Sequence, residues 1–174
     1  ANYIEAFKWF TRCAKAGEPL CEGNLGALYH AGKGVKQNYG EAVKWYRAAA
    51  MKGVGNAQTL LGDMYHDGKG IEQSLEQAYN WYTKAAVQKY PRAQTNLGIY
   101  YLQGYFVKKD ISKALEWFNQ AAQQQFAPAE AILAHLYLKA DDAPRNEARA
   151  VALYQKAAGR GLDEAQVDLA ELYM

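Results

Sequence analysis

The chain has 174 residues and a formal net charge of +2, with 20 Lys and Arg against 18 Asp and Glu. Half of the residues are apolar and 22% are charged, which is the composition of a folded protein and excludes a disordered segment. Charges this evenly balanced exclude the clustered basic surface of a nucleic-acid-binding protein. No apolar run approaches the about 18 residues that a membrane span needs. We therefore expect no nucleic acid among the partners and no membrane insertion.

One pattern repeats every 36 residues, as the positions of Trp9, Trp45, Trp81 and Trp117 show. The other columns on this spacing are Tyr29, Tyr65, Tyr101, Tyr137 and Tyr173; Leu25, Leu61, Leu97, Leu133 and Leu169; Gly26, Gly62, Gly98, Ala134 and Ala170; and Ala6, Ala42, Ala78, Ala114 and Ala150. Such a period indicates a solenoid, in which each unit stacks on its neighbours to bury its apolar face. We expect a single array over residues 1–174, with full units at 18–53, 54–89, 90–125 and 126–161 and partial units at 1–17 and 162–174.

Each unit predicts two helices. The second helix of the first full unit has apolar residues at helical spacing from Tyr39 to Ala50. A column of capping residues precedes each second helix: Asn2, Asn38, Ser74, Asp110 and Asn146. Ser74 and Gln77 have the spacing of a capping box. In the first helix, at about residues 57–67 of the next unit, Gly62 lets the two helices approach closely, and we expect the large Trp and Tyr side chains to fill the spaces on either side.

The turn between the two helices carries glycines that end the first helix. The first two full units have Gly32 and Gly34, then Gly68 and Gly70, where glycine supplies a left-handed backbone. The third unit has Phe106 in place of the second glycine, and the fourth has no glycine at residues 140–144. These last two loops are predicted to differ in shape. None of the glycine pairs continues as a phosphate-binding motif.

These residues resemble the Sel-1-like repeat, a relative of the tetratricopeptide repeat. The resemblance is carried by NAQTLLGDMYHDGKG at residues 56–70 and AYNWYTKAA at residues 78–86, and it extends over essentially the whole chain. It implies an all-α fold, a right-handed superhelix of 36-residue helix-turn-helix repeats. It also implies a role in protein–protein interaction, without a cofactor and usually without catalysis. Leu153 replaces the Trp of the fourth unit, and Ala134 and Ala170 replace the Gly.

In this family the first helices line the concave surface, so their outward positions that do not repeat are the candidates for binding a partner. The candidate groove residues are Asn24, Ala27, His30, Asn56, Thr59, Leu60, Asp63, His66, Arg92, Asn96, Ile99, Leu102, Ile132, His135 and Leu138. The strip is polar at its start and gains aliphatic residues further along. An exposed apolar patch commonly marks a binding site, which favours a groove for an extended or helical segment of another protein. The alternative is that the aliphatic residues are covered by neighbouring helices and contribute only packing.

Metal binding and catalysis have little support in the sequence. His30 and His66 are equivalent, and Asp63 lies one turn before His66, so a metal site of two His and one Asp is conceivable. No third strong ligand recurs at a matching height, and adjacent helices lie about 8–10 Å apart. We expect two ordinary groove-facing imidazoles, no metal and no cofactor. No nucleophile stands at motif spacing from a His and an acid.

Cys13 and Cys21 occupy two columns that hold Ala in the other units. Their spacing across a tight helix turn allows the Cα–Cα distance of about 4.4–6.8 Å that a disulfide needs. A cysteine-rich, exported bacterial branch of the family has a similar pair, shifted by one residue. The alternatives are a disulfide or two reduced core cysteines. A disulfide implies a periplasmic or exported protein, and reduced thiols leave a cytoplasmic one open.

The array opens inside a second helix and closes before a partner helix appears, so its apolar ends are expected either to continue into a longer protein or to be covered by another copy. The leading hypothesis for function is a non-catalytic scaffold that binds another protein or peptide as an adaptor, an assembly factor or an inhibitor of the immunity type. One alternative is weak β-lactam binding or hydrolysis, as in cysteine-rich relatives. The other is a structural module that self-associates end to end.

Overall fold

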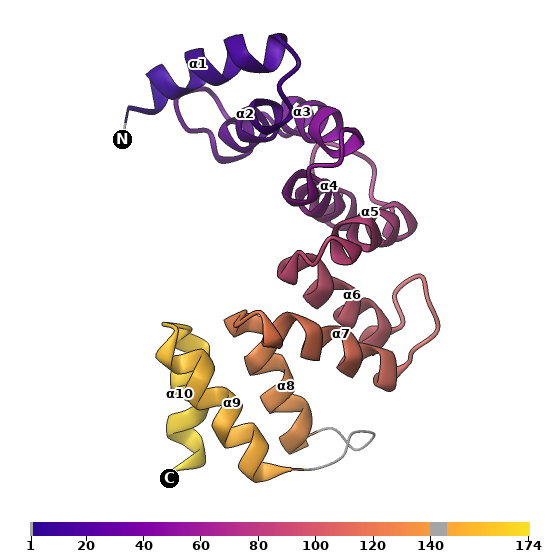
Figure 1. Ribbon diagram of the computed structural model, residues 1–174, viewed down its shortest axis with the longest axis vertical. Helices are drawn as coiled ribbons and strands as arrows, with labels where there is room; N and C mark the ends of the chain where they lie inside the picture. Colours follow the sequence, from indigo (N-terminus) through magenta and orange to yellow (C-terminus); the bar gives the residue numbers. More distant parts are fainter. Residues whose placement is uncertain (1, 140–145) are drawn as a thin grey trace. The chain divides into compact units, whose positions relative to one another are not determined.

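The computed structural model describes residues 2–139 and 146–174, and in these residues every regular element is a helix. The helices are α1 (Tyr3–Lys15), α2 (Pro19–Ala31), α3 (Tyr39–Met51), α4 (Gly55–Asp67), α5 (Leu75–Val87), α6 (Pro91–Gln103), α7 (Ile111–Gln123), α8 (Ala127–Lys139), α9 (Glu147–Gly159) and α10 (Asp163–Leu172), as Figure 1 shows. The even-numbered helices are the predicted first helices, and the odd-numbered ones are the second helices. The all-α, helix-turn-helix prediction is confirmed.

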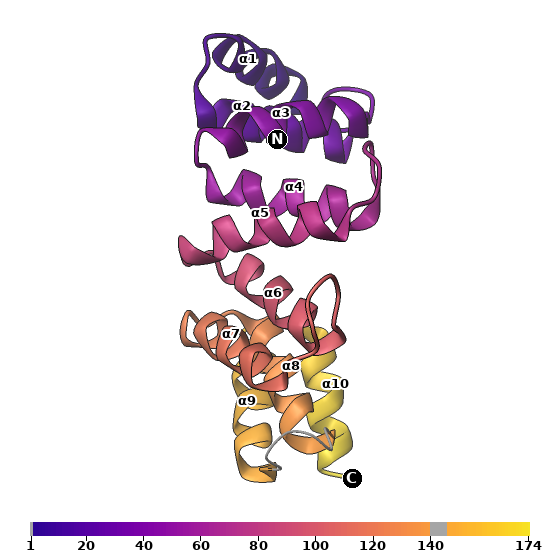
Figure 2. The same cartoon turned by 90° about the vertical axis from the view of Figure 1, so that its right-hand side faces the viewer.

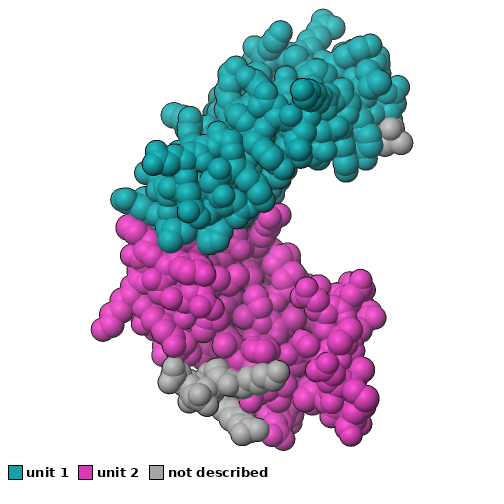
Figure 3. All heavy atoms as spheres, turned by 180° about the vertical axis from the view of Figure 1, so that it is seen from behind, with its two compact units in different colours: residues 1–90 teal, residues 91–174 magenta. Residues whose placement is uncertain are grey.

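The chain divides into two compact units, residues 1–90 and residues 91–174 (Figure 3). The first unit holds α1 to α5, and within it each helix packs against the next one along the chain (Figure 2). The second unit holds α6 to α10, packed in the same sequential way. Consecutive packing inside each unit is the arrangement expected of stacked repeats. That the whole chain forms one array stays a prediction.

The predicted capping residues begin all five second helices. Asn2, Asn38, Ser74, Asp110 and Asn146 each accept a hydrogen bond from the backbone amide three residues later. The capping-box prediction holds only in part, because the amide of Ser74 donates to the carbonyl oxygen of Tyr65 at 2.9 Å and not to Gln77. The same amide-to-Tyr bond recurs in the other loops, from Asn38, Asp110 and Asn146. The repeating Tyr column therefore ties the end of each first helix to the start of the second.

The turns after the first helices are more alike than the sequence indicates. Gly34 and Gly70 adopt φ of 73° and 70°, and Phe106 adopts 60°, so the aromatic residue takes the same left-handed conformation. The prediction that the third loop differs in shape is wrong at this position. The flanking helices fix the loop at both ends. This constraint outweighs the cost of about 1–2 kcal/mol that a non-glycine residue incurs in the left-handed conformation. The fourth loop lies outside the described residues.

The buried ring of each repeat lies one residue beyond the Trp column. Tyr46, Tyr82, Phe118 and Tyr154 are all at most 2% exposed, whereas Trp81 is only partly buried. The prediction that large aromatic side chains fill the space beside the small column is therefore confirmed for Tyr, and it is wrong for Trp, whose ring is only partly buried. The column of small residues that contains Gly62 allows the close approach that was expected, because a Cβ added at Gly62 would lie 2.6 Å from the Tyr82 ring. Burial, and secondarily the nearby Asp168 carboxylate, raises the pKa of Tyr154 above the ordinary tyrosine value.

A second feature of the interior is a pair of polar side chains in each repeat, one on the first helix and one just after the second helix. We call these pairs latches. They are Glu22 with Lys52 (2.6 Å), Gln58 with Gln88 (2.8 Å), Gln94 with Gln124 (2.7 Å) and Glu130 with Arg160 (3.4 Å). The first member of each pair is buried. A buried polar group needs a hydrogen-bonding or ionic partner, and each latch supplies that partner within its own repeat.

Candidate functional site

In the first unit, the predicted groove residues lie on α2 and α4. Asn24 and Asn56 are exposed, and Ala27, His30, Leu60, Asp63 and His66 are partly buried. Thr59 is 1% exposed, and its hydroxyl donates to the carbonyl oxygen of Gly55 at 2.9 Å. Its predicted outward position is wrong, because the side chain bonds back to its own helix and turns inward. The surface of α2 and α4 is therefore a polar strip of which Thr59 is not part.

The imidazole and carboxylate groups of this strip already have partners within the protein. His30 lies edge-on to Tyr39, with ring centroids 5.4 Å apart, and its Nδ1 is 3.5 Å from the hydroxyl of Tyr46. Asp63 accepts a hydrogen bond of 2.8 Å from the hydroxyl of Tyr82. Among residues 2–139 and 146–174, no three His, Cys, Asp or Glu side chains come together as a metal site would require. The strip is thus arranged as a set of polar groups fixed by the aromatic column beneath it.

In the second unit, the predicted groove residues lie on α6 and α8. Arg92 and His135 are exposed, and Asn96, Ile99, Leu102, Ile132 and Leu138 are partly buried. The four aliphatic side chains pack against the buried cluster of this unit. Both alternatives raised by the sequence therefore apply to them, since one side of each contributes to packing and the other is open to solvent. The surface combines apolar side chains with a polar margin.

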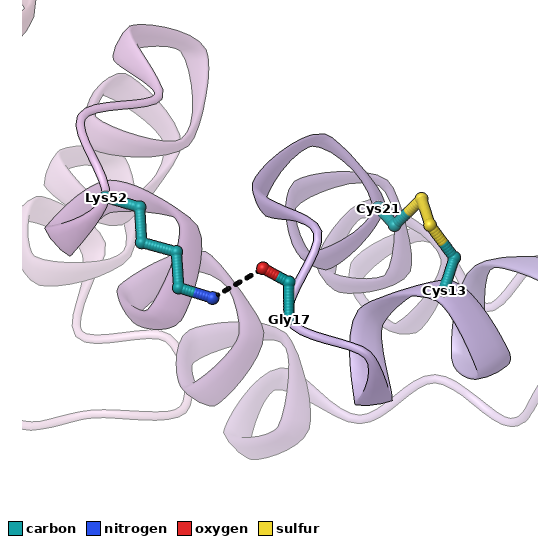
Figure 4. The surroundings of a disulfide bond; sticks show 4 residues. All are labelled: Cys13, Gly17, Cys21 and Lys52. Atoms are coloured by element: carbon teal, nitrogen blue, oxygen red, sulfur yellow. Dashed lines mark hydrogen bonds between the residues drawn. A yellow bond between two sulfur atoms is a disulfide. The ribbon is translucent and has the colours of Figure 1, made fainter.

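Cys13 and Cys21 form a disulfide that joins the end of α1 to the start of α2, with Cα atoms 5.7 Å apart (Figure 4). Of the two alternatives, the structure has the disulfide and not the reduced pair. Both cysteines are partly buried, whereas Ala49 and Ala57 at the equivalent positions are at most 1% exposed. On the other side of the same turn, Lys52 Nζ donates to the carbonyl oxygen of Gly17 at 2.8 Å. The turn is therefore fixed covalently and by a hydrogen bond.

Replacing both cysteines by Ala is expected to lower the free energy of unfolding by about 2.5 kcal/mol. Ala is the residue that other repeats have in these columns, so the folded state should lose little packing and the effect should come from the less constrained unfolded chain. Urea unfolding with and without reductant measures it. Adding reductant should destabilise the wild type by the same amount and leave the double variant unchanged. An equal response of both proteins to reductant would contradict the prediction.

Comparison with protein families divides the chain at the starts of the first helices α2, α4, α6 and α8. Five stretches match the model of the Sel1 repeat: residues 1–18, 19–54, 55–89, 91–126 and 127–162. The chain belongs to the Sel1 repeat family. Sel1 repeats mediate protein–protein interaction, and Sel1 repeat proteins are generally non-catalytic scaffolds. None of the described helices is long and apolar enough to cross a membrane.

Solved Sel1 structures resemble the chain closely. A Sel1 repeat protein from Oxalobacter formigenes is 33% identical with a TM-score of 0.94, covering 99% of this chain and 69% of that one. The protective antigen c5321 of uropathogenic Escherichia coli strains is 34% identical with a TM-score of 0.88, covering 99% of this chain and 37% of the antigen. The immunity protein Pa5087 of Pseudomonas aeruginosa is 23% identical with a TM-score of 0.68, covering 94% and 61%, and shares the fold. A search of curated proteins gave no match.

One further feature was not predicted from the repeat columns: a pocket of about 260 Å³ lies among α7, α8 and α9. Its lining includes Asn119, Ala122, Glu130, Leu133, Leu153 and Lys156. The signal for it was present in the sequence, because Leu153 is the residue that breaks the Trp column. A smaller side chain in a column of large ones leaves space, and here that space opens beside a buried carboxylate.

Proposed function

We propose that this chain is a non-catalytic scaffold that binds another protein or peptide along the surface of its first helices. The observation that carries the proposal is the composition of α6 and α8 in the second unit, where half-buried Ile99, Leu102, Ile132 and Leu138 share a surface with exposed Arg92 and His135. Protein interfaces combine an apolar centre with a polar rim in this way. Side chains already held by the core also lose little conformational freedom when a partner covers them.

Among scaffold roles, an adaptor, an assembly factor and an inhibitor all fit this surface. An inhibitory role is supported by the fold that the chain shares with immunity proteins of Pseudomonas aeruginosa. The Cys13–Cys21 disulfide supports action in an oxidising compartment, such as the bacterial periplasm or the outside of the cell, because such bonds persist there. The partner is accordingly an exported or secreted protein, or a segment of one.

A charge-reversal experiment tests the surface. The double variant Arg92→Glu/His135→Glu changes only exposed side chains on α6 and α8, so the melting temperature should stay close to that of the wild type. We expect the variant to bind its partner at least about tenfold more weakly. The partner is first isolated by co-purification with the tagged wild-type chain from the native extract, and its affinity for each variant is then measured by titration calorimetry.

The matched control is Lys108→Glu/Ser112→Glu, which introduces the same change in charge at exposed positions of the loop and of α7, away from the first helices. It should bind as the wild type does. Aspartate at Ile99 or Leu102 is a poorer test, since both side chains pack partly against the core and their loss would also lower stability. Equal affinity for the wild type and the α6/α8 variant would rule this surface out as the binding site.

A further inference from the structure

We propose that the pocket among α7, α8 and α9 binds an aromatic side chain of the partner protein, and tryptophan above all. The inference rests on the proposed function and adds to it a specific contact. The pocket has a volume of about 260 Å³, which lies just below the range of drug-sized ligand sites, about 300–1,000 Å³, and suits a single ring system. Aromatic anchors seated in pockets contribute much of the binding energy of protein interfaces.

The chain itself contains the corresponding site with its aromatic residue in place. In the first unit, Trp81 of α5 packs against a buried cluster that includes Ala50 and Leu61. Two repeats later, Ala122 and Leu133 occupy the columns of Ala50 and Leu61, and both line the pocket. Leu153 stands in the column of Trp81 and is too small to fill the same space. The pocket is therefore the place that an indole occupies in the first unit.

A lysine of the repeat is already positioned for a ring. In the first unit, Lys84 Nζ lies 4.1 Å from the centroid of the Trp81 ring, a close cation–π contact. Lys156 occupies the same column in the second unit and lines the pocket. Residue 153 is a leucine, so the ammonium group of Lys156 has no aromatic ring to cover at that position. A ring supplied by the partner would complete the contact that Lys84 makes within the chain.

The pocket also contains an acceptor suited to an indole N–H group. The side chain of Glu130 is 3% exposed, and its Oε2 atom accepts no hydrogen bond within the described part of the chain, although Arg160 Nη1 lies 3.4 Å away. A buried carboxylate oxygen without a hydrogen bond is unfavourable. Tryptophan carries a donor on an otherwise apolar ring and so suits both the acceptor and the apolar wall. Phenylalanine would leave Oε2 as it is, which is why tryptophan is preferred.

The polar rim indicates that the ring arrives on a polypeptide. Asn119, which is partly buried, and Arg149, which is exposed, also line the pocket, and Arg149 Nη2 donates to Asn119 Oδ1 at 3.2 Å. Amide and guanidinium groups at this edge can bond to the backbone of a bound segment, which a free indole lacks. The pocket thus pairs an apolar floor for a side chain with a polar margin for the chain that carries it.

The test uses N-acetyl-5-fluorotryptophanamide as the probe and 5-fluoroindole as its counterpart without a backbone, each followed by fluorine NMR. We expect saturable binding of the amide probe to the wild-type chain. Leu153→Trp places an indole of the chain in the pocket and should abolish probe binding. Lys156→Ala should weaken binding about fivefold. Its matched control, Lys84→Ala, removes the equivalent lysine of the first unit and should leave the affinity unchanged.

Three results would overturn the proposal: no saturable binding of the amide probe, unchanged binding by a folded Leu153→Trp variant, or binding of 5-fluoroindole at least as tight as that of the amide probe. If Leu153→Trp fails to fold by circular dichroism, equal affinities of Lys156→Ala and the wild type decide against the proposal. The Arg92→Glu/His135→Glu variant should bind the probe normally, because neither residue lines the pocket. Failure of the first-helix surface and failure of this pocket are therefore distinguishable.

Discussion

Tyr82→Ala is expected to lower the free energy of unfolding by about 3–5 kcal/mol, the usual cost of removing a large ring from a packed interior. The Tyr82 side chain is 2% exposed and fills the space left by Gly62 on the neighbouring helix. Because Gly62 has no side chain, it has no atoms that could move in to fill the space left by the ring. Chemical denaturation followed by circular dichroism measures the loss.

The control for this prediction is Tyr82→Phe, which keeps the ring and removes only the hydroxyl that donates to Asp63. Phe118 occupies the same column in the next repeat and is fully buried, so a phenyl ring fits the site. We expect a loss of about 1.5–2 kcal/mol, because the lost hydrogen bond is made to a carboxylate. A Tyr82→Ala variant as stable as Tyr82→Phe would show that the ring does not carry the packing assigned to it.

Lys52→Met is expected to cost about 3 kcal/mol at neutral pH, because it leaves the buried Glu22 carboxylate without its ammonium partner. The Glu22 side chain is 6% exposed, and Lys52 Nζ is 2.6 Å from its Oε1 atom. Lys44→Met is the matched control on α3, the helix that Lys52 directly follows. Lys44 pairs with Glu41 at 3.5 Å, but its side chain is 67% exposed, so its loss should cost less than about 0.5 kcal/mol.

The neighbouring repeats predict how to repair this variant. Gln58 and Gln88 form the same latch without charge, at 2.8 Å. The double variant Glu22→Gln/Lys52→Gln should therefore lie within about 1 kcal/mol of the wild type, since no buried charge remains unpaired. Thermal unfolding of the single and double variants tests the pair. A double variant less stable than Lys52→Met would disprove the latch as an interchangeable unit.

The sequence was sufficient to predict the fold because the repeat columns report helix positions several times over. Asn38, Ser74 and Asp110 are each weak capping signals alone, and their 36-residue spacing makes them specific. The same regularity did not show that only one of the two adjacent aromatic columns is fully buried. Trp81 and Tyr82 are adjacent, so a small rotation of the helix decides between them, and that rotation depends on contacts with the next helix.

The candidate surface was predicted less completely. Thr59 has the spacing of an outward residue, but its hydroxyl bonds to its own helix and lies inside. The pocket was missed for a related reason. In the sequence, Leu153 is only a departure from the Trp column, and the space that it leaves becomes apparent only when the lining residues of α7 and α8 are placed around it. Periodicity gives the direction of a side chain on one helix. It does not give the space that three helices leave between them.

The latches have a consequence for how such a chain can grow or shrink. Both members of every latch fall inside one matched repeat, as Glu22 and Lys52 do within residues 19–54 and Glu130 and Arg160 within residues 127–162. Duplicating or deleting a whole repeat therefore never separates a buried acid from its base. A gene that gained or lost repeats at these boundaries would conserve electrostatic neutrality in its interior at every step, and an engineer who shortens or lengthens the array should cut at the same places.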